Sequence, residues 1–168
     1  WGAILCPSTV TGRMLLAGLG VAFYQQVSGS EAIVYYTPTI LAGFGVQSVG
    51  ARNFGAVLIG VAKFSGACAG AFFLDLVGRR AGVILSCAGV ASCLVTLALF
   101  QHVAGPAVGL TALCAFMIFF ELGLAPAAFV LGAESYPLAI RAKCLSLGMF
   151  ITRFLSGLVA VVFPSLVG

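Results

Sequence analysis

The sequence predicts an all-α integral membrane protein, and three observations lead to this prediction. Hydrophobic residues make up 62% of the 168 residues and charged residues only 7%, against roughly a quarter charged in a typical soluble domain. Apolar runs of about 20 residues recur between short polar breaks, which is the length that a helix needs to cross a bilayer. The 22 glycines and 14 phenylalanines are typical of close helix crossings and of lipid-facing bulk.

The apolar runs predict five transmembrane spans, at about residues 14–42, 54–74, 81–100, 107–132 and 145–167. Residues 1–13 resemble the end of a connecting cytoplasmic loop. The first span would be roughly 43 Å long as a continuous helix, which exceeds a hydrocarbon core of about 30 Å. We therefore expect a break at residues 27–30, where a Ser-Gly-Ser turn signal lies. The third span carries no charge, which indicates a lipid-facing scaffold.

The basic residues predict the orientation of these spans. Alternating crossings place five of them on one side and only Arg52 on the other; the five are Arg13, Arg79, Arg80, Arg141 and Lys143. Cytoplasmic loops carry such an excess, so the first side is expected to be cytoplasmic. Because the chain starts at Trp1 and an odd span count is unusual for a bundle, we expect a fragment of a longer polypeptide.

Polar residues interrupt the first span near its centre. Gln25, Gln26, Ser28 and Glu31 lie there, and a charge in hydrocarbon costs roughly 2.5 to 3.5 kcal/mol on insertion scales. Such side chains should face protein or a water-filled cavity, and helix interruptions at this depth free backbone groups for a ligand. The stretch therefore predicts a binding site for a polar solute, as in a transporter.

Four charged residues lie within the expected spans: Glu31, Lys63, Glu121 and Arg153. By depth, Glu31 could pair with Lys63, and Glu121 with Arg153. The alternative is that these pairs only fix helix positions. Tyr35 and Tyr36 could likewise be plain interface anchors. A stripe of small residues at Ala62, Gly66 and Gly70 predicts close packing against another helix.

Nothing in the sequence indicates an enzyme, a cofactor or a metal site. The six cysteines show no paired spacing and fall singly along the apolar runs, as expected of small buried residues. His102 has no metal-spaced partner, and no phosphate-binding glycine loop of the G-x-x-x-x-G-K type is present. The basic residues are few and scattered, which gives no support for nucleic-acid binding.

Three motifs occur in a fixed order along the chain: QQVSGSEAIVYYTP at residues 25–38, DLVGRR at 75–80 and ELGLAPAAFVLGAESYPLAIR at 121–141. In order and spacing they resemble the sugar porter family of the major facilitator superfamily. The chain is most similar to the C-terminal half of plant and algal polyol/monosaccharide-proton symporters. The resemblance covers essentially the whole chain and implies transmembrane helices 7 to 11 of a half-bundle.

The resemblance also implies roles for particular residues. The substrate-binding set that it implies is Gln25, Gln26, Glu31, Tyr35, Lys63, Glu121 and Phe129. Glu31 and Lys63 stand where the family usually has asparagines. The polyol branch of the family has a Glu and a Lys at these two places. Phe129 stands where many members have a tryptophan. The implied intracellular gate is a salt-bridge network of Asp75, Arg79, Glu134 and Arg141.

These residues together predict transmembrane transport of a sugar or polyol by alternating access, as carbohydrate:proton symport. The expected partners are the sugar or polyol, possibly protons, the lipid bilayer and an N-terminal half of the same chain. Two alternatives stay open: a non-transporting membrane sugar sensor, and an inactive truncated fragment. The sequence does not distinguish the plasma membrane from an organellar membrane.

Overall fold

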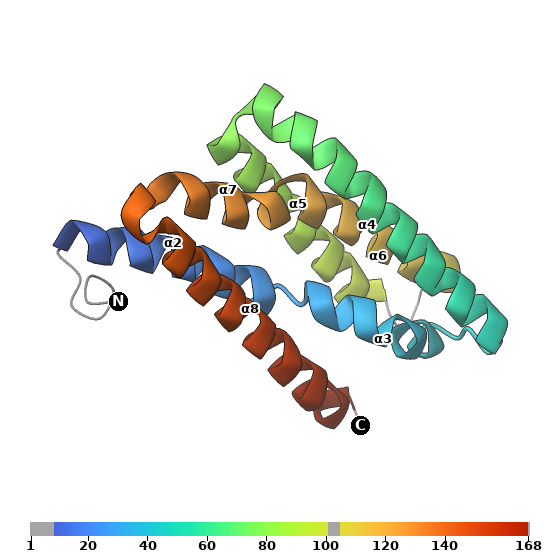
Figure 1. Cartoon of the computed structure of the whole chain (residues 1–168). Coiled ribbons are helices and arrows are strands. Elements are labelled where there is room, and N and C mark those ends of the chain that lie inside the picture. The colour runs from blue at the N-terminus through green and yellow to red at the C-terminus, as the bar shows by residue number, and fades with distance from the viewer. Residues whose placement is uncertain (1–8, 101–104, 168) are drawn as a thin grey trace. The chain divides into compact units, whose positions relative to one another are not determined.

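The computed structural model describes residues 9–100 and 105–167, and helices joined by short turns account for most of them (Figure 1). No strand occurs within these two ranges. The helices are α2 (Thr9–Val27), α3 (Ser30–Gly43), α4 (Val49–Val77), α5 (Arg79–Phe100), α6 (Pro106–Phe119), the π-helical segment η1 (Phe120–Leu124), α7 (Ala125–Ser135) and α8 (Leu138–Val167). The predicted all-α fold is confirmed.

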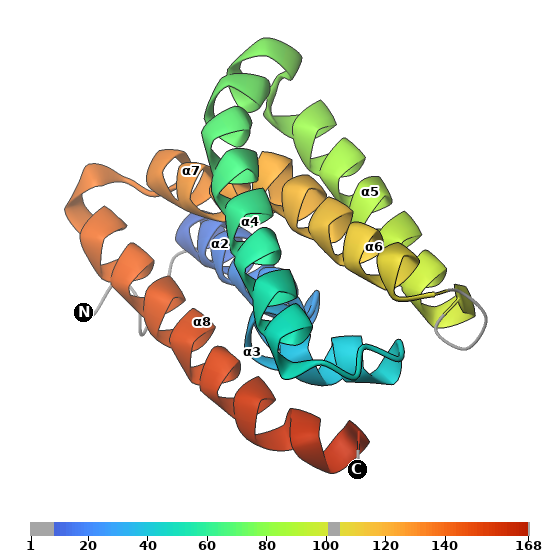
Figure 2. The same cartoon turned by 90° about the vertical axis from the view of Figure 1, so that its right-hand side faces the viewer.

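The helices form two compact units, which we describe separately. The α2–α8 unit contains the residues up to Glu31 and those from Ala127 onward, and in it α2 packs against α8. The α4–α6 unit contains Ala32–Pro126, and in it α4, α5, α6 and η1 pack against one another. Figure 2 shows α4, α5 and α6 side by side. The predicted substrate-binding residues are therefore divided between two structural units.

Within the described residues, four helices are long and apolar enough to cross a membrane. They cover Val49–Val77, Arg79–Phe100, Pro106–Val130 and Leu138–Val162, which correspond to the last four expected spans. The first expected span, residues 14–42, is instead divided into α2 and α3. The molecule is an integral, multi-pass membrane protein.

The division of the first span lies where the sequence predicts it. α2 ends at Val27 and α3 begins at Ser30. Gly29 has a φ of +83°, a left-handed conformation that glycine adopts without steric cost. The Ser28 hydroxyl donates to the Gln25 carbonyl at 2.6 Å, and this bond satisfies one of the open carbonyls at the end of α2.

Several helices extend beyond the expected spans. Residues 9–13, expected in a loop, form the first turns of α2, and α4 and α8 begin at Val49 and Leu138 instead of near residues 54 and 145. Hydropathy marks the part of a helix that lies in hydrocarbon, but a helix continues as long as its backbone bonds are satisfied. These helices therefore begin before the expected membrane-spanning segments, and the bounds of the spans themselves stay predictions.

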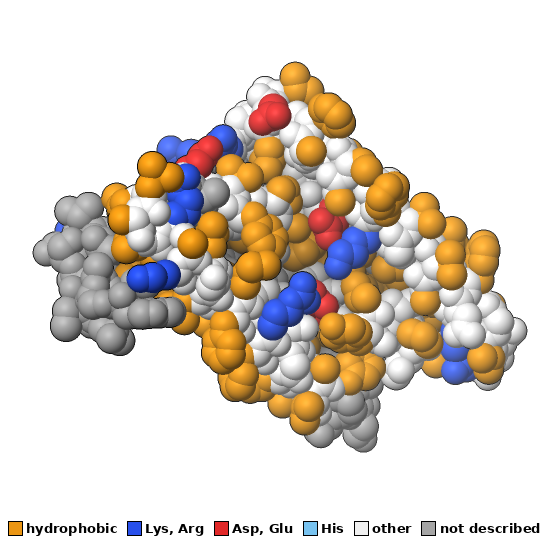
Figure 3. Space-filling view, viewed as in Figure 1, with side chains coloured by type: hydrophobic (Ala, Val, Ile, Leu, Met, Phe, Trp, Pro, Cys, Tyr) orange, Lys and Arg blue, Asp and Glu red, His pale blue; other side chains and the backbone are white. Residues whose placement is uncertain are grey.

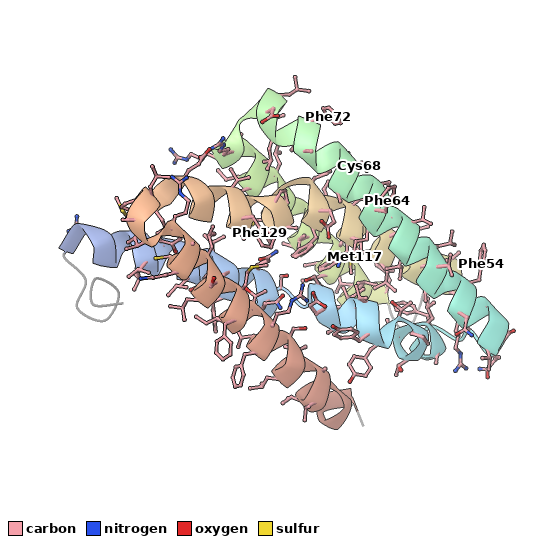
Figure 4. The ribbon with its side chains drawn as sticks, in the orientation of Figure 1. Phe54, Phe64, Cys68, Phe72, Met117 and Phe129 are labelled. Atoms are coloured by element: carbon pink, nitrogen blue, oxygen red, sulfur yellow. The ribbon has the colours of Figure 1, made fainter. Side chains whose placement is uncertain are left out.

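Large apolar side chains cover much of the surface (Figure 3). On α4 they include Phe54, Phe64 and Phe72, which are 63%, 73% and 74% exposed and lie along one side of the helix (Figure 4). The opposite side of α4 buries Ile59, Gly66 and Gly70 among other residues. A soluble protein rarely exposes so large an apolar surface, so this side of α4 is suited to contact with lipid.

Candidate functional site

A cavity of about 130 Å³ lies inside the α2–α8 unit. Three parts of the chain line it: α2, α7 together with the turn that follows α7, and α8. Its lining residues are Gly18, Ala22, Gln25, Ala128, Phe129, Tyr136, Cys144, Leu145, Gly148, Met149, Thr152 and Arg153. A cavity needs only about 10–15 Å³ to hold a water molecule. This one therefore has room for several waters or for part of a small solute.

Two residues of the predicted substrate-binding set, Gln25 and Phe129, line this same cavity. Gln25 is buried at 8% exposure, and the ring of Phe129 is about half exposed; it lies on α7 (Figure 4). An amide offers hydrogen-bond donors and an acceptor, and an aromatic face packs against the C–H face of a polyhydroxylated ligand. Few polar groups on an otherwise apolar wall are typical of small-molecule sites.

The structure gives Gln26 a different environment from Gln25. Gln26 is 4% exposed, and its Nε2 donates to the Thr152 carbonyl at 2.7 Å. This bond joins α2 to α8 directly beside the cavity. The resemblance assigns both glutamines to sugar hydroxyls, but the geometry gives at least one amide hydrogen of Gln26 a structural role.

Tyr136, which the sequence analysis did not single out, forms part of the cavity wall. It is 2% exposed, and its hydroxyl lies against Gly18, where an added Cβ would overlap it. Burial raises the pKa of the Tyr136 phenol above its ordinary value, and the nearby Cys144 raises it further. The phenol therefore stays protonated at neutral pH and keeps its O–H donor.

Substitution of Gln25 and substitution of Gln26 are expected to have different effects on stability and on sugar binding. Gln26→Leu removes the hydrogen bond to the Thr152 carbonyl between α2 and α8 and is expected to lower the free energy of unfolding by about 0.5–1.5 kcal/mol. Gln25→Leu is expected to weaken sugar binding while the thermal stability stays near that of the wild type. Thermal unfolding of the detergent-solubilised protein, with binding of labelled sorbitol, separates the two effects. Equal effects of both substitutions on stability would contradict this assignment.

A second polar feature lies in the α4–α6 unit. The Lys63 ammonium on α4 lies 3.8 Å from Oε1 of Glu121 on η1. The Glu121 side chain is 12% exposed and that of Lys63 is 39% exposed. The sequence analysis expected both residues in the site but did not pair them, although both lie near the middle of their helices. The pair places two opposite charges near the middle of two helices that are apolar enough to cross a membrane.

Small residues bring the backbones of α4 and η1 together beside this pair. An added Cβ on Gly66 would lie 3.0 Å from the Glu121 Cβ and 3.1 Å from the Ile118 Cα, and one on Gly70 would overlap the Glu121 carbonyl oxygen. The predicted close packing of this stripe is confirmed. The stripe sets the distance between α4 and η1, and with it the distance between Lys63 and Glu121.

A family model described as "Sugar (and other) transporter" matches residues 4–168. The chain belongs to the sugar porter family of the major facilitator superfamily. The chain is 36% identical to "Probable polyol transporter 4" of Arabidopsis thaliana over 98% of its length. It is 27% identical to "Polyol transporter 5" over 97% and 28% identical to "D-xylose-proton symporter-like 2" over 92%, both of Arabidopsis thaliana. The matches span 32%, 32% and 31% of these relatives, so the chain covers about a third of their length.

Two other residues that the sugar porter resemblance implies, Glu31 and Tyr35, are not among the lining residues of the cavity. Glu31 is partly exposed in the first turn of α3, where the helix dipole favours a carboxylate. Tyr35 is 51% exposed. The pairs Glu31–Lys63 and Glu121–Arg153 each join a residue of one unit to a residue of the other, and both stay predictions.

The four residues of the predicted gate also belong to different units. Asp75 and Arg79 are exposed around the α4–α5 turn, and Glu134 is exposed near the end of α7. The Arg141 Nε donates to the Tyr136 carbonyl at 3.2 Å, which fixes the turn between α7 and α8. This bond connects Arg141 of the predicted gate to Tyr136 of the cavity wall. The salt-bridge network itself stays a prediction.

Proposed function

We propose that the complete protein moves a sugar or polyol across a membrane by alternating access, and that this chain supplies half of the binding site. The observation that supports this most is that Gln25 and Phe129 line one partly open cavity, although they lie 104 positions apart in the sequence. An amide for hydroxyl groups and an aromatic face for C–H groups are complementary to a polyhydroxylated solute. The names of the relatives, a polyol transporter and a D-xylose-proton symporter, agree with this substrate class.

Coupling to protons is part of the same proposal. One relative is named a proton symporter, and the α4–α6 unit holds a carboxylate and an ammonium 3.8 Å apart, near the middle of two apolar helices. Protonation of the Glu121 carboxylate would change the charge beside the substrate path. A proton gradient could in this way be linked to the substrate-bound state.

Uptake by the complete protein in proteoliposomes tests this proposal. Labelled sorbitol, D-xylose and D-glucose are offered separately, with and without an inwardly directed proton gradient. We expect saturable uptake of at least one solute, faster with the gradient. Binding without uptake would identify a non-transporting receptor. Uptake at the same rate with and without the proton gradient would exclude proton coupling. Absence of both binding and uptake would contradict the proposal.

A further inference from the structure

The carboxylate of the Lys63–Glu121 pair is carried by an irregular piece of helix. η1, Phe120–Leu124, is a single π-helical segment between α6 and α7. Its backbone bonds join residues five apart, as the Ala125 N–H to the Phe120 carbonyl shows. Pro126, just beyond, has no N–H for the Leu122 carbonyl, so a regular α-helix would lack a bond here. Such π segments frequently occur at functional sites.

A side chain from a neighbouring helix completes the wide turn. The Ser86 hydroxyl of α5 donates to the Phe119 carbonyl at 2.6 Å, and the Leu124 N–H donates to the Ser86 Oγ at 3.0 Å. These two backbone groups are the pair that a π-helical bond would join directly, since they lie five residues apart. The Ser86 hydroxyl is thus inserted into the backbone ladder at the place of one of its bonds.

Close backbone packing holds Ser86 at this position. Ser86 is 1% exposed. A Cβ added to Gly123 would lie 2.5 Å from the Gly82 carbonyl oxygen and 2.8 Å from the Ser86 Cβ. On the other side, Gly70 of α4 lies against the Glu121 backbone. η1 therefore lies between two glycine-lined helix faces, and Ser86 supplies the hydrogen bonds.

We propose that Ser86 is a positioning residue, whose hydroxyl holds η1 in its π-helical register and thereby keeps the Glu121 carboxylate beside Lys63 in the substrate site. The part about substrate rests on the proposed function. Loss of the hydroxyl would leave the Phe119 carbonyl and the Leu124 N–H without these partners. The turn could then tighten toward an α-helical register, in which each residue is rotated by about 100° from the next. Glu121 would turn relative to α4.

Backbone exchange tests the structural part. Hydrogen–deuterium exchange of the peptide covering residues 119–126 is compared in the complete wild-type protein, Ser86→Ala and Ser92→Ala. Ser92 is a matched control, because it is an exposed serine of α5 whose hydroxyl donates to the Gly89 carbonyl of its own helix. We expect about tenfold faster exchange in Ser86→Ala and no change in Ser92→Ala. Unchanged exchange in Ser86→Ala would overturn the proposal.

A double-mutant cycle tests the link to Glu121. We expect Ser86→Ala to raise the dissociation constant for labelled sorbitol about fivefold in the wild-type background, and less than about twofold when Glu121→Gln is already present. An equal effect in both backgrounds would show that Ser86 acts independently of Glu121, and would overturn the positioning role. If Ser86→Ala gives no folded protein, Ser86→Cys keeps a weak donor and acceptor and is measured in the same cycle.

The two readouts distinguish failure of this inference from failure of the proposed function. A wild-type protein that neither binds nor carries sorbitol, D-xylose or D-glucose contradicts the proposed function. The exchange experiment still decides whether Ser86 holds η1, because it needs no ligand.

Discussion

Replacing Gly70 by alanine is expected to abolish transport and to remove most of the folded protein. The added Cβ would overlap the Glu121 carbonyl oxygen and lie 3.2 Å from the Leu122 Cα. Both atoms belong to the backbone of η1, so no side-chain rotation can relieve the overlap. Overpacking of a tight interface costs about 1–3 kcal/mol, occasionally more, and here α4 must also move away from η1, which would separate Lys63 from Glu121. Fluorescence-detected size-exclusion chromatography and uptake of labelled sorbitol measure the two losses.

Gly60→Ala is the matched control for this substitution. Gly60 lies on the same helix, is exposed and has no atom within 4 Å of an added Cβ. Because alanine favours helix over glycine by about 1 kcal/mol, this variant should be as stable as the wild type or slightly more stable. A monodisperse, active Gly70→Ala protein would show that α4 and η1 do not lie as close as described.

Lys63→Met is expected to reduce the initial rate of uptake at least tenfold at equal expression. It removes the ammonium 3.8 Å from the Glu121 carboxylate, which is only 12% exposed, and a largely buried carboxylate that loses its countercharge is destabilising. The double variant Lys63→Met/Glu121→Gln should therefore fold better than Lys63→Met alone. Uptake normalised to the amount of protein at the membrane, together with thermal stability, measures both effects.

Lys63→Arg serves as the charge-preserving control and is expected to retain the stability of the pair. Strictly additive effects of the two substitutions on stability would contradict a direct interaction between Lys63 and Glu121. Since Lys63 is about two-fifths exposed, the stability effect should be modest and the uptake effect large. A loss confined to stability would assign the pair a purely structural role.

Much of the fold could be predicted from the sequence, because hydrocarbon leaves few structures open to an apolar chain. Long apolar runs must be helical in a bilayer, so α4, α5, the α6–α7 stretch and α8 were expected. The break at Gly29 followed from the turn signal and the excess length of the first span. The close approach of Gly66 and Gly70 followed from their spacing on α4.

The details of the site were harder to predict. The third span carries no charge and was expected to be lipid-facing scaffold, yet its Ser86 lies buried in the ladder of η1. A single serine in an apolar helix gives no sign of which backbone it contacts, since serine most often bonds within its own helix. The π segment was not predicted either, although Pro126 next to a glutamate-bearing turn is a signal for an irregular ladder. The pairing of Lys63 with Glu121 required the tertiary fold, because several partners share the same depth.

The most direct test of the central claim is the affinity of the complete protein for labelled sorbitol after Phe129→Ala, beside Phe64→Ala. Both rings are more than half exposed, but only Phe129 lines the cavity that Gln25 also lines, while Phe64 lies on the apolar side of α4 (Figure 4). We predict that Phe129→Ala raises the dissociation constant about tenfold and that Phe64→Ala leaves it unchanged. An unchanged dissociation constant in Phe129→Ala, or equal changes in both variants, would contradict the assignment of this cavity as the sugar site.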